Sequence, residues 1–236
     1  DARVGILVRH RGRAVIARGT AHLVDPLAGR GLGSLLRPDL PFTALGYLAR
    51  NERRVIGTLL DGPSATLPLT RTALRIELTA VALLDAQGLH AHGGPWPEPT
   101  ALLAGDLAAR RPDLADVPPP LRSLLDADAA AVLGWHTADG PAALPARWRG
   151  DGSVTVPPGA LELVGALSAA PACLTVQRSG HRISSVRGLM LAGPGRARSG
   201  DGPSTVRIDA DRVSWWSGEE SGTVKTTADI SPDRIA

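Results

Sequence analysis

A hairpin expected around Asp139 and Gly140 carries the side chains best suited to hold an anionic ligand. A two-residue turn at this point gives the hairpin one apolar face, formed by Leu133, Trp135, Leu144 and Ala146. The other face, or its margin, receives Val132, His136, Arg147 and Arg149. Guanidinium groups bind phosphate oxygens through paired hydrogen bonds, so this second face could bind the anionic tail of a cofactor. The alternative is that its polar side chains only face solvent.

Three other features could carry chemistry, and each has a structural alternative. His90 and His92 have the spacing to lie on one side of a strand, but no acidic or thiol ligand is near them in the sequence, so no metal site is predicted. Trp215 and Trp216 occupy opposite faces of the last strand, which predicts one indole in the core and the other over an interface or a flat ligand. Cys173 falls in an expected strand, which favours an inert buried thiol over a nucleophile.

No catalytic residue can be assigned from the sequence. The nucleophile motif G-x-S-x-G is absent, which argues against a serine hydrolase, and the dinucleotide motif G-x-G-x-x-G is absent as well. His10, His22 and His181 lie in or beside expected strands and turns. A single histidine is more often a hydrogen-bonded structural residue than an axial haem ligand, and haem stays open as a ligand.

The composition is typical of a globular protein without a nucleic-acid or membrane surface. The chain has 236 residues, 43% of them apolar, and a net charge of +3, with 26 basic and 23 acidic residues interspersed along it. No basic cluster stands out, so no nucleic-acid partner is expected. No apolar run approaches the roughly 20 residues of a membrane span. A single cysteine excludes an internal disulfide framework, which predicts a protein of the reducing cytoplasm.

Two β-hairpins of similar sequence organise the chain. Residues 3–24 predict two strands joined near Arg11 and Gly12, and they align without a gap with residues 172–193. The strands of the later hairpin are expected to meet in a two-residue turn at Ser179 and Gly180. Gly188 interrupts the second of these strands and suggests a bulge or a close approach to the backbone. A further similar pair of strands, residues 72–85 and 204–217, follows in the same order.

This repeat predicts a mainly β fold with a few helices, in which two antiparallel split β-barrel domains follow each other in tandem. The first domain is assigned to residues 1–92, a helix and a proline-rich linker to 93–123, and the second domain to 124–236. Helices are expected at residues 100–111, 121–130 and 160–168. The hairpin at residues 131–149 has no counterpart in the first half. The first barrel could therefore lack its opening hairpin, and the sequence could be a fragment of a longer chain.

The second half resembles the FMN-binding split barrels, the pyridoxamine 5'-phosphate oxidase-like superfamily, and in particular its actinobacterial members. The similarity is carried by AAVLGWHTADGPAALPARW, APACLTVQRSGHRISSVRGLMLAG and VRIDADRVSWWSGEESGTV, which occur in this order within residues 130–224. It implies a six-stranded antiparallel barrel that usually dimerises and holds FMN, a deazaflavin or haem in a groove between barrels. Two barrels in one chain could form that groove by themselves.

Flavin-binding members of this superfamily commonly present a lysine and an asparagine on the helix before the third strand. By resemblance these positions fall near Leu163 and Ala166, so both polar groups are absent from this chain. Arginines on neighbouring strands could supply the positive charge instead. The resulting candidate cofactor site consists of His136, Arg147, Arg149, Arg182, Arg187 and Trp216.

The resemblance implies a cytoplasmic, flavin- or deazaflavin-binding oxidoreductase-like protein that acts on a small organic substrate, with FMN as the first choice of cofactor. Two alternatives remain open. One is a haem-binding protein of the same fold, and the other is a non-catalytic barrel pair that serves as a binding or assembly module without a cofactor. The expected partners are a small-molecule cofactor and substrate, with a homodimer or an intramolecular pair of barrels forming the site.

Overall fold

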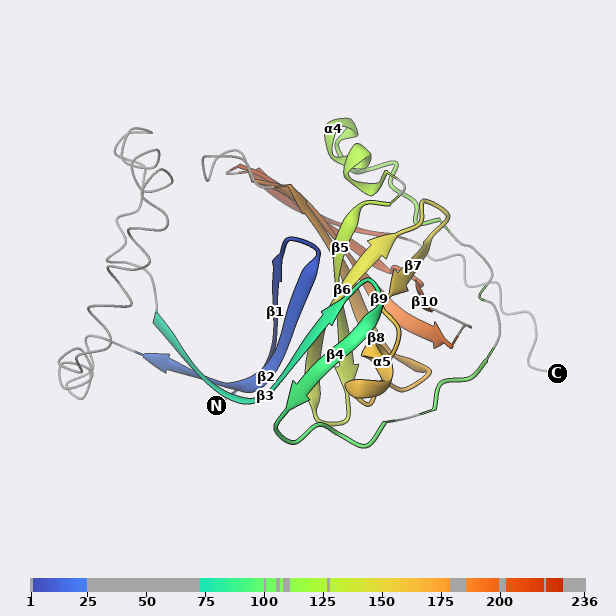
Figure 1. Ribbon diagram of the computed structural model, residues 1–236. Coiled ribbons are helices and arrows are strands. Elements are labelled where there is room, and N and C mark those ends of the chain that lie inside the picture. The colour runs from blue at the N-terminus through green and yellow to red at the C-terminus, as the bar shows by residue number, and fades with distance from the viewer. Residues whose placement is uncertain are drawn as a thin grey trace.

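The chain folds mainly into β-structure, as the sequence predicts. The computed structural model describes residues 2–24, 73–99, 101–104, 107, 111–126, 128–178, 186–199, 203–218 and 220–226. These residues form a closed six-stranded barrel and a separate four-stranded antiparallel sheet (Figure 1). Arg182, Ser179 and Gly180 lie outside the described residues.

The barrel is built by the second half of the chain. Its strands are β5 (Ala130–Thr137), β6 (Gly140–Trp148), β7 (Ser153–Val156), β8 (Ala169–Arg178), β9 (Arg187–Arg198) and β10 (Ser204–Ile208). They pair in the order β10-β7-β6-β5-β8-β9, and pairing between β9 and β10 closes the ring. The short helix α5 (Ala160–Leu163) connects β7 to β8. The predicted six-stranded antiparallel barrel is confirmed.

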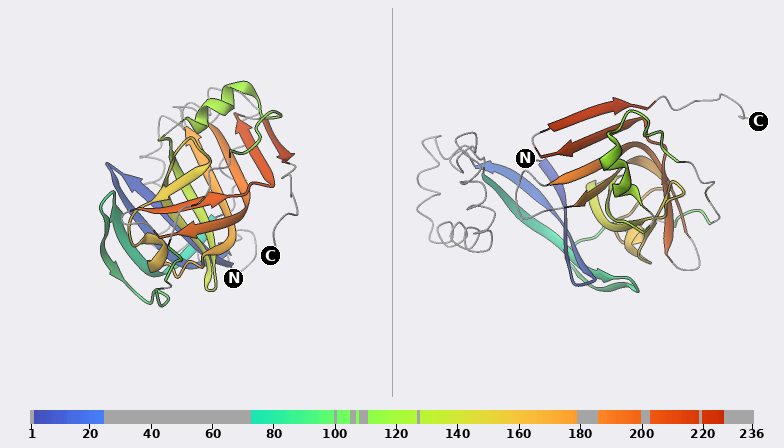
Figure 2. Two further views of the ribbon diagram at one scale, coloured as in Figure 1. Left: turned by 90° about the vertical axis from the view of Figure 1, so that its right-hand side faces the viewer. Right: turned by 90° about the horizontal axis from the view of Figure 1, so that it is seen from above.

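On its side away from β8, strand β9 pairs with two different strands along its length. Its C-terminal part, from Gly195 to Arg198, pairs with β10. Its N-terminal part, from Arg187 to Ala192, pairs with β11 (Arg212–Ser217), and β11 pairs in turn with β12 (Glu220–Lys225). Strands β11 and β12 therefore extend the sheet beyond the closed ring (Figure 2).

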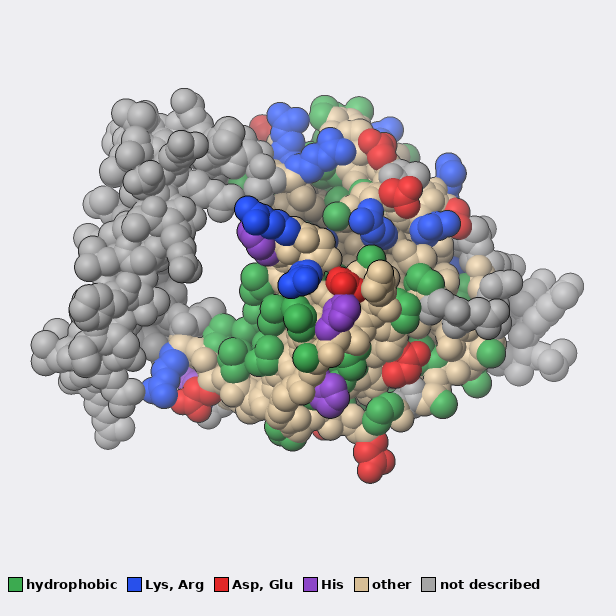
Figure 3. All heavy atoms as spheres, in the orientation of Figure 1, with side chains coloured by type: hydrophobic (Ala, Val, Ile, Leu, Met, Phe, Trp, Pro, Cys, Tyr) green, Lys and Arg blue, Asp and Glu red, His purple; other side chains and the backbone are tan. Residues whose placement is uncertain are grey.

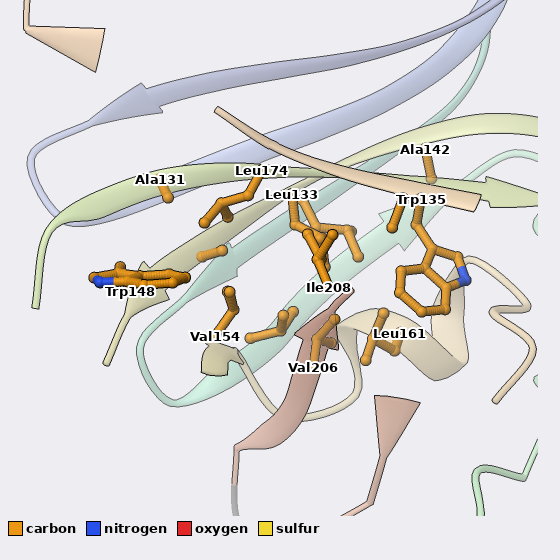
Figure 4. Close-up of a cluster of buried hydrophobic side chains, with 14 of the residues drawn as sticks. Ala131, Leu133, Trp135, Ala142, Trp148, Val154, Leu161, Leu174, Val206 and Ile208 are labelled. Carbon is orange, nitrogen blue, oxygen red and sulfur yellow. The ribbon is translucent and has the colours of Figure 1, made fainter. Parts of the chain in front are cut away.

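Side chains fill the interior of the barrel. The apolar face predicted for the β5–β6 hairpin is buried, because Leu133, Trp135, Leu144 and Ala146 are each 5% exposed or less. Figure 4 shows side chains of other elements converging on this face, among them Val154, Leu161, Leu174, Val206 and Ile208, together with Trp148 at the end of β6. Such a packed core gives the barrel a rigid wall, and it directs the search for a ligand site to the outside of the barrel.

The first half of the chain forms the four-stranded sheet, a meander with the order β1-β2-β3-β4. Its strands are β1 (Ala2–His10), β2 (Arg13–Val24), β3 (Ala73–Asp85) and β4 (Gly88–Gly93). One face of the sheet joins the hydrophobic cluster of the barrel through Ile16, Ala82 and Leu84. Among the described residues, this half is an open sheet and not a second closed barrel.

The opposite face of the same sheet is also apolar. Strand alternation places the paired residues Val8 and Val15 away from the barrel, and they are 58% and 36% exposed. Figure 3 shows hydrophobic side chains gathered over β1 to β3 on this side. Most antiparallel sheets pair one core face with one polar face, so this sheet is unusual in being apolar on both faces.

The two halves share an order of strands but differ in register. In each half a hairpin is followed by a strand that lies antiparallel to the second strand of that hairpin. In the first half Val81 pairs with Ala17, whereas in the second half Val213 pairs with Leu191. The sequence alignment matches Ala17 with Val186, so it predicts the strand order correctly and the register incorrectly.

The two hairpins also differ in the way their own strands are connected. Arg11 and Gly12 form the predicted two-residue turn, with His10 paired to Arg13 and positive φ angles of 46° and 80° at the two turn residues. The predicted two-residue turn at Ser179 and Gly180 is wrong, because Arg178 pairs with Arg187 and residues 179–186 connect the strands.

The β5–β6 turn lies one residue earlier than predicted. Thr137 pairs with Gly140, so Ala138 and Asp139 form the turn, and the Thr137 hydroxyl donates a hydrogen bond of 2.8 Å to the Gly140 carbonyl. Moving a turn by one residue changes the pairing by two residues, which preserves the two faces. The prediction of which side chains enter the core is therefore confirmed although the turn is displaced.

Glycines at matched positions of the two hairpins permit close contacts. At Gly19 the pairing of β2 with β3 shifts register, and a Cβ there would lie 2.3 Å from the Glu77 carbonyl oxygen. At Gly188 the pairing is continuous, but the Trp216 indole lies over the backbone, 2.1 Å from where a Cβ would be. The close approach predicted at Gly188 is thus made by a side chain.

The helices are shorter than predicted. The described residues 101–104 of the expected helix at 100–111 are not helical, and Ala104 instead bridges to Ser199. The expected helix at 121–130 is reduced to α4 (Pro119–Arg122) and the 3-10 turn η2 (Ser123–Leu125), because β5 begins at Ala130. Helix α5 covers only the first turn of the expected helix at 160–168.

A substitution at Gly5 tests how closely the four-stranded sheet packs on the barrel. A Cβ at Gly5 would lie 2.7 Å from the Pro141 carbonyl oxygen and 2.9 Å from the Ala142 Cα, whereas a Cβ at Gly93 would meet nothing within 4 Å. Gly5→Ala is expected to lower the free energy of unfolding by about 1–3 kcal/mol, because backbone atoms must move apart. Gly93→Ala is the control and should change it by less than about 0.5 kcal/mol in urea unfolding. Equal effects of the two substitutions would contradict this docking.

Candidate functional site

The junction between the four-stranded sheet and the barrel is held by backbone contacts and by two arginines of the sheet. Arg9 donates a hydrogen bond of 3.0 Å to the Ala131 carbonyl. Burial lowers the pKa of the Arg9 guanidinium, which nevertheless stays charged at neutral pH. Arg18 donates to the Asp139 carbonyl at 2.9 Å and lies 3.6 Å from an Asp139 carboxylate oxygen. These bonds fix the sheet against the β5–β6 hairpin.

A cavity of about 510 Å³ opens at the end of this junction, between β4, the following loop and α5. The loop, residues 94–99, contains three prolines whose rings restrict the backbone, so it forms a stiff wall. Gly165 allows the loop to pack on the barrel, because a Cβ there would lie 3.0 Å from Pro97. The side chains that line the cavity include Leu89, His92, Trp96, Glu98, Glu162 and Leu163.

Two polar atoms in the wall of this cavity are buried without a hydrogen-bond partner. They are the indole nitrogen Nε1 of Trp96 and the carboxylate oxygen Oε2 of Glu162. Trp135 and Trp148 also have unpaired indole nitrogens, but these belong to the barrel core. What distinguishes the cavity is that an unpaired donor, on the loop after β4, and an unpaired acceptor, on α5, both belong to residues that line it. Buried polar groups are normally satisfied, so such a pair marks a place where a bound water or ligand is expected.

The two neighbouring histidines of β4 have different surroundings. His92 lines the cavity. His90 Nε2 lies 2.5 Å from an Asp85 carboxylate oxygen, so an acidic partner exists that the sequence spacing did not reveal. A hydrogen bond from the Gln87 backbone is the main cause that lowers the pKa of Asp85, and His90 contributes to the same shift. Among the described residues, no three potential metal ligands gather in one place.

A second, more polar cleft of about 290 Å³ adjoins the cavity. Pro95 lines both. The cleft lies where β1, β2 and β3 meet the β5–β6 turn, and its polar lining comes from Arg3, Arg18, Thr20, Thr79 and Asp139. The aliphatic part of Arg3 crosses over Gly140, where a Cβ would lie 3.0 Å from the Arg3 Cβ. Neither arginine is among the candidate site residues that the sequence predicts.

The candidate residues on the barrel are not gathered in one place. His136 is exposed beside the β5–β6 turn, whereas Arg147 pairs with Ala130 at the other end of the hairpin. Six residues of strand separate these levels, or roughly 20 Å. Arg187 pairs with Arg178 on β8, so two strands, β5 and β8, lie between it and Arg147, which corresponds to roughly 14 Å along the sheet.

The other two candidates lie near the same end of the barrel as Arg147. Arg149 is in the turn after β6, where its backbone N–H donates to the Ser153 carbonyl at 3.0 Å. Hydrogen bonds from Ser153 are the main cause that lowers the pKa of Asp151, and the charge of Arg149 adds to the shift. Trp216 is half-buried and covers Gly188, while Trp215 packs against the core, as predicted for this pair. Whether these residues hold a cofactor stays a prediction.

The positions that the resemblance relates to a lysine and an asparagine are both buried. Leu163 is 7% exposed and lines the cavity, and Ala166 is fully buried. An apolar side chain thus stands at the cavity wall where the superfamily commonly has a cation. A phosphate group in this cavity would face Glu98 and Glu162 instead of a positive charge.

Comparison with known proteins yields little. No protein-family model and no curated protein match the chain. Among solved structures, it is similar to a haem-binding protein from Mycobacterium smegmatis, with 14% sequence identity and a TM-score of 0.34. The similarity covers 49% of this chain and 59% of that one, so less than two thirds of that protein is matched. A similarity this low carries no inference about a ligand. No helix in the described part of the chain is long and apolar enough to cross a membrane.

Cys173 is predicted to be an unreactive thiol in the folded protein. It lies on β8 beside Gly134, and burial raises the pKa of its thiol. Because the thiolate is the reactive form, alkylation by iodoacetamide at pH 8 should be several-fold slower than that of free cysteine and should reach the ordinary rate after unfolding in urea. Labelling followed by mass spectrometry measures both rates. A folded rate equal to that of free cysteine would mean that the thiol is accessible and activated.

Proposed function

We propose that this split-barrel protein binds a flavin-type cofactor, FMN or a deazaflavin, in the cavity between β4 and α5, and that it acts as an oxidoreductase on a small organic substrate. The observation that carries the proposal is the unpaired donor of Trp96 together with the unpaired acceptor of Glu162. The polar edge of a flavin ring presents carbonyl acceptors beside an N–H donor, which is the complementary arrangement. A ligand of this kind would satisfy both buried atoms at once.

The remaining lining of the cavity suits a flat ring. Its apolar surfaces come from Leu89, Leu163, the Trp96 indole and the proline rings of residues 94–99. Aromatic and apolar walls with a few placed polar groups are typical of cofactor sites, and the volume of about 510 Å³ lies within the range of such sites. The ring would therefore be held by packing on its faces and by hydrogen bonds at one edge.

When bound, a flavin supplies hydride or electron transfer, and the protein supplies binding, orientation and electrostatics. Trp96 and Glu162 would orient the ring, while the stiff proline wall would limit its motion. Among the described residues, His92 contributes the one imidazole that lines the cavity. The cytoplasmic location and the formation of a homodimer remain predictions from the sequence.

Haem is the second candidate, and His92 is the observation that favours it. An imidazole is a usual axial ligand of haem iron, and His92 lines the cavity. The macrocycle itself has no hydrogen-bonding edge for Trp96 and Glu162, which is why a flavin-type ring is preferred. A protein that binds neither cofactor would support the non-catalytic binding module.

Conservative substitutions in the cavity wall test the flavin proposal. Trp96→Phe removes the indole N–H and Glu162→Gln removes the carboxylate charge, and each should weaken FMN binding by about three- to tenfold. Trp148→Phe is the matched control, because it removes an unpaired indole N–H from the barrel core. Quenching of flavin fluorescence gives the dissociation constants. If Trp96→Phe and Glu162→Gln bind FMN as tightly as the wild type, the ring does not lie in this cavity.

The haem alternative has its own test. Hemin titration followed at the Soret band should show weaker binding and an altered spectrum for His92→Ala if His92 ligates the iron. His90→Ala serves as control, because His90 lies on the same strand but pairs with Asp85 and does not line the cavity. Identical spectra for His92→Ala and the wild type would reject His92 as the ligand.

A further inference from the structure

We propose that the cleft between Arg3 and Arg18 binds the anionic end of the ligand whose ring occupies the neighbouring cavity. The inference rests on the proposed function and specifies its ligand: a flat ring joined by a linker to a phosphate or carboxylate group. The anion site would then lie on the four-stranded sheet and not on the barrel strands.

The charges of the two spaces are opposite. Among the described residues, the cavity is lined by the carboxylates of Glu98 and Glu162 and by no arginine or lysine. The cleft is lined by two guanidinium groups and one carboxylate, that of Asp139. A ligand with a neutral ring and an anionic end therefore has one favourable orientation across the pair of spaces.

The two arginines have different roles. The Arg18 side chain is 14% exposed and is held by Asp139, so its charge is fixed in the cleft wall. The Arg3 side chain makes no hydrogen bond or ion pair with another described residue, and it is exposed beside the same turn. Arg3 is thus free to form the paired hydrogen bonds that a guanidinium makes with phosphate or carboxylate oxygens, while Arg18 adds positive charge next to it.

The cleft and the cavity are close enough to serve one ligand. Pro95 lines both spaces, and Gly94, in the cavity wall, contacts Thr79, in the cleft wall. The contact is so close that a Cβ on Gly94 would lie 2.2 Å from the Thr79 carbonyl oxygen. A linker that passes Pro95 would reach from the ring to the arginines.

This assignment also accounts for the residue at the superfamily's lysine position. Leu163 faces the cavity, so no cation is available on α5. Arg147 and Arg187 lie on strands that are roughly 14 Å apart along the barrel sheet, and they line neither of the two spaces. Arg3 and Arg18 line the same cleft.

A comparison of FMN with riboflavin tests the inference, because the two differ only in the phosphate group. The full chain should bind FMN about tenfold or more tightly than riboflavin. Arg3→Ala should remove most of this difference by weakening FMN binding, with riboflavin binding unchanged, and Arg3→Glu should weaken FMN further. Arg75→Ala is the matched control, since Arg75 is an exposed arginine of the same sheet that pairs with Glu77 outside the cleft.

Each result decides between the two proposals. Equal affinities of the wild type for FMN and riboflavin, or an equal loss for both in Arg3→Ala, would overturn the anion cleft and leave the ring site standing. A selective loss of FMN binding in Arg147→Ala or Arg187→Ala, but not in Arg3→Ala, would place the phosphate on the barrel and overturn the cleft. Binding of neither flavin would overturn the flavin proposal. The anion cleft would then stand only if hemin binds more tightly than its dimethyl ester and Arg3→Ala removes that preference, and otherwise it would be overturned as well.

Discussion

The contact of two backbones, made where β1 crosses the β5–β6 hairpin, is the constraint on which the other features depend. Gly5 has no side chain, so its backbone approaches the Pro141 carbonyl and the Ala142 Cα more closely than any other residue type allows. This approach brings Ile16, Ala82 and Leu84 into the same apolar cluster as the barrel core. It also sets the position of β4 and of the loop after it, and thereby the width of the cavity between β4 and α5.

Much of the fold could be predicted because alternation of apolar residues is a local signal. The alternation in β5 and β6 identified the four core residues of that hairpin, and it tolerated an error in the turn, since a displacement by one residue keeps each side chain on its face. The connection between β8 and β9 could not be predicted, because Ser179 and Gly180 are a turn signal by composition whereas the register is set by pairing along ten residues of strand. The register of β3 on β2 depends on a bulge at Gly19 that a gapless alignment does not represent.

The candidate site was harder to predict than the fold, because its residues come from three distant segments. Trp96 lies in a loop whose sequence shows only that it is rich in glycine and proline, and Glu162 lies on a one-turn helix. Arg3 and Arg18 belong to a hairpin in which the spacing of the arginines is not distinctive. The sequence favours Arg147 and Arg187 instead, which lie on barrel strands and line neither space. The residues of the candidate site, by contrast, come together only because the sheet packs on the barrel, and that packing has no local signal in the sequence.

The origin of the cavity walls has a thermodynamic consequence. One wall belongs to the sheet and its following loop, and the other belongs to the barrel through α5. A ligand that contacts both walls binds only when the sheet is packed on the barrel, so its binding free energy is linked to the association of sheet and barrel. At a concentration one hundred times its dissociation constant, a ligand of this kind contributes about 2.7 kcal/mol to that association. Separation of the sheet from the barrel would in turn release the ligand. The fraction of protein with bound ligand and the fraction with an intact sheet–barrel interface therefore report on the same equilibrium.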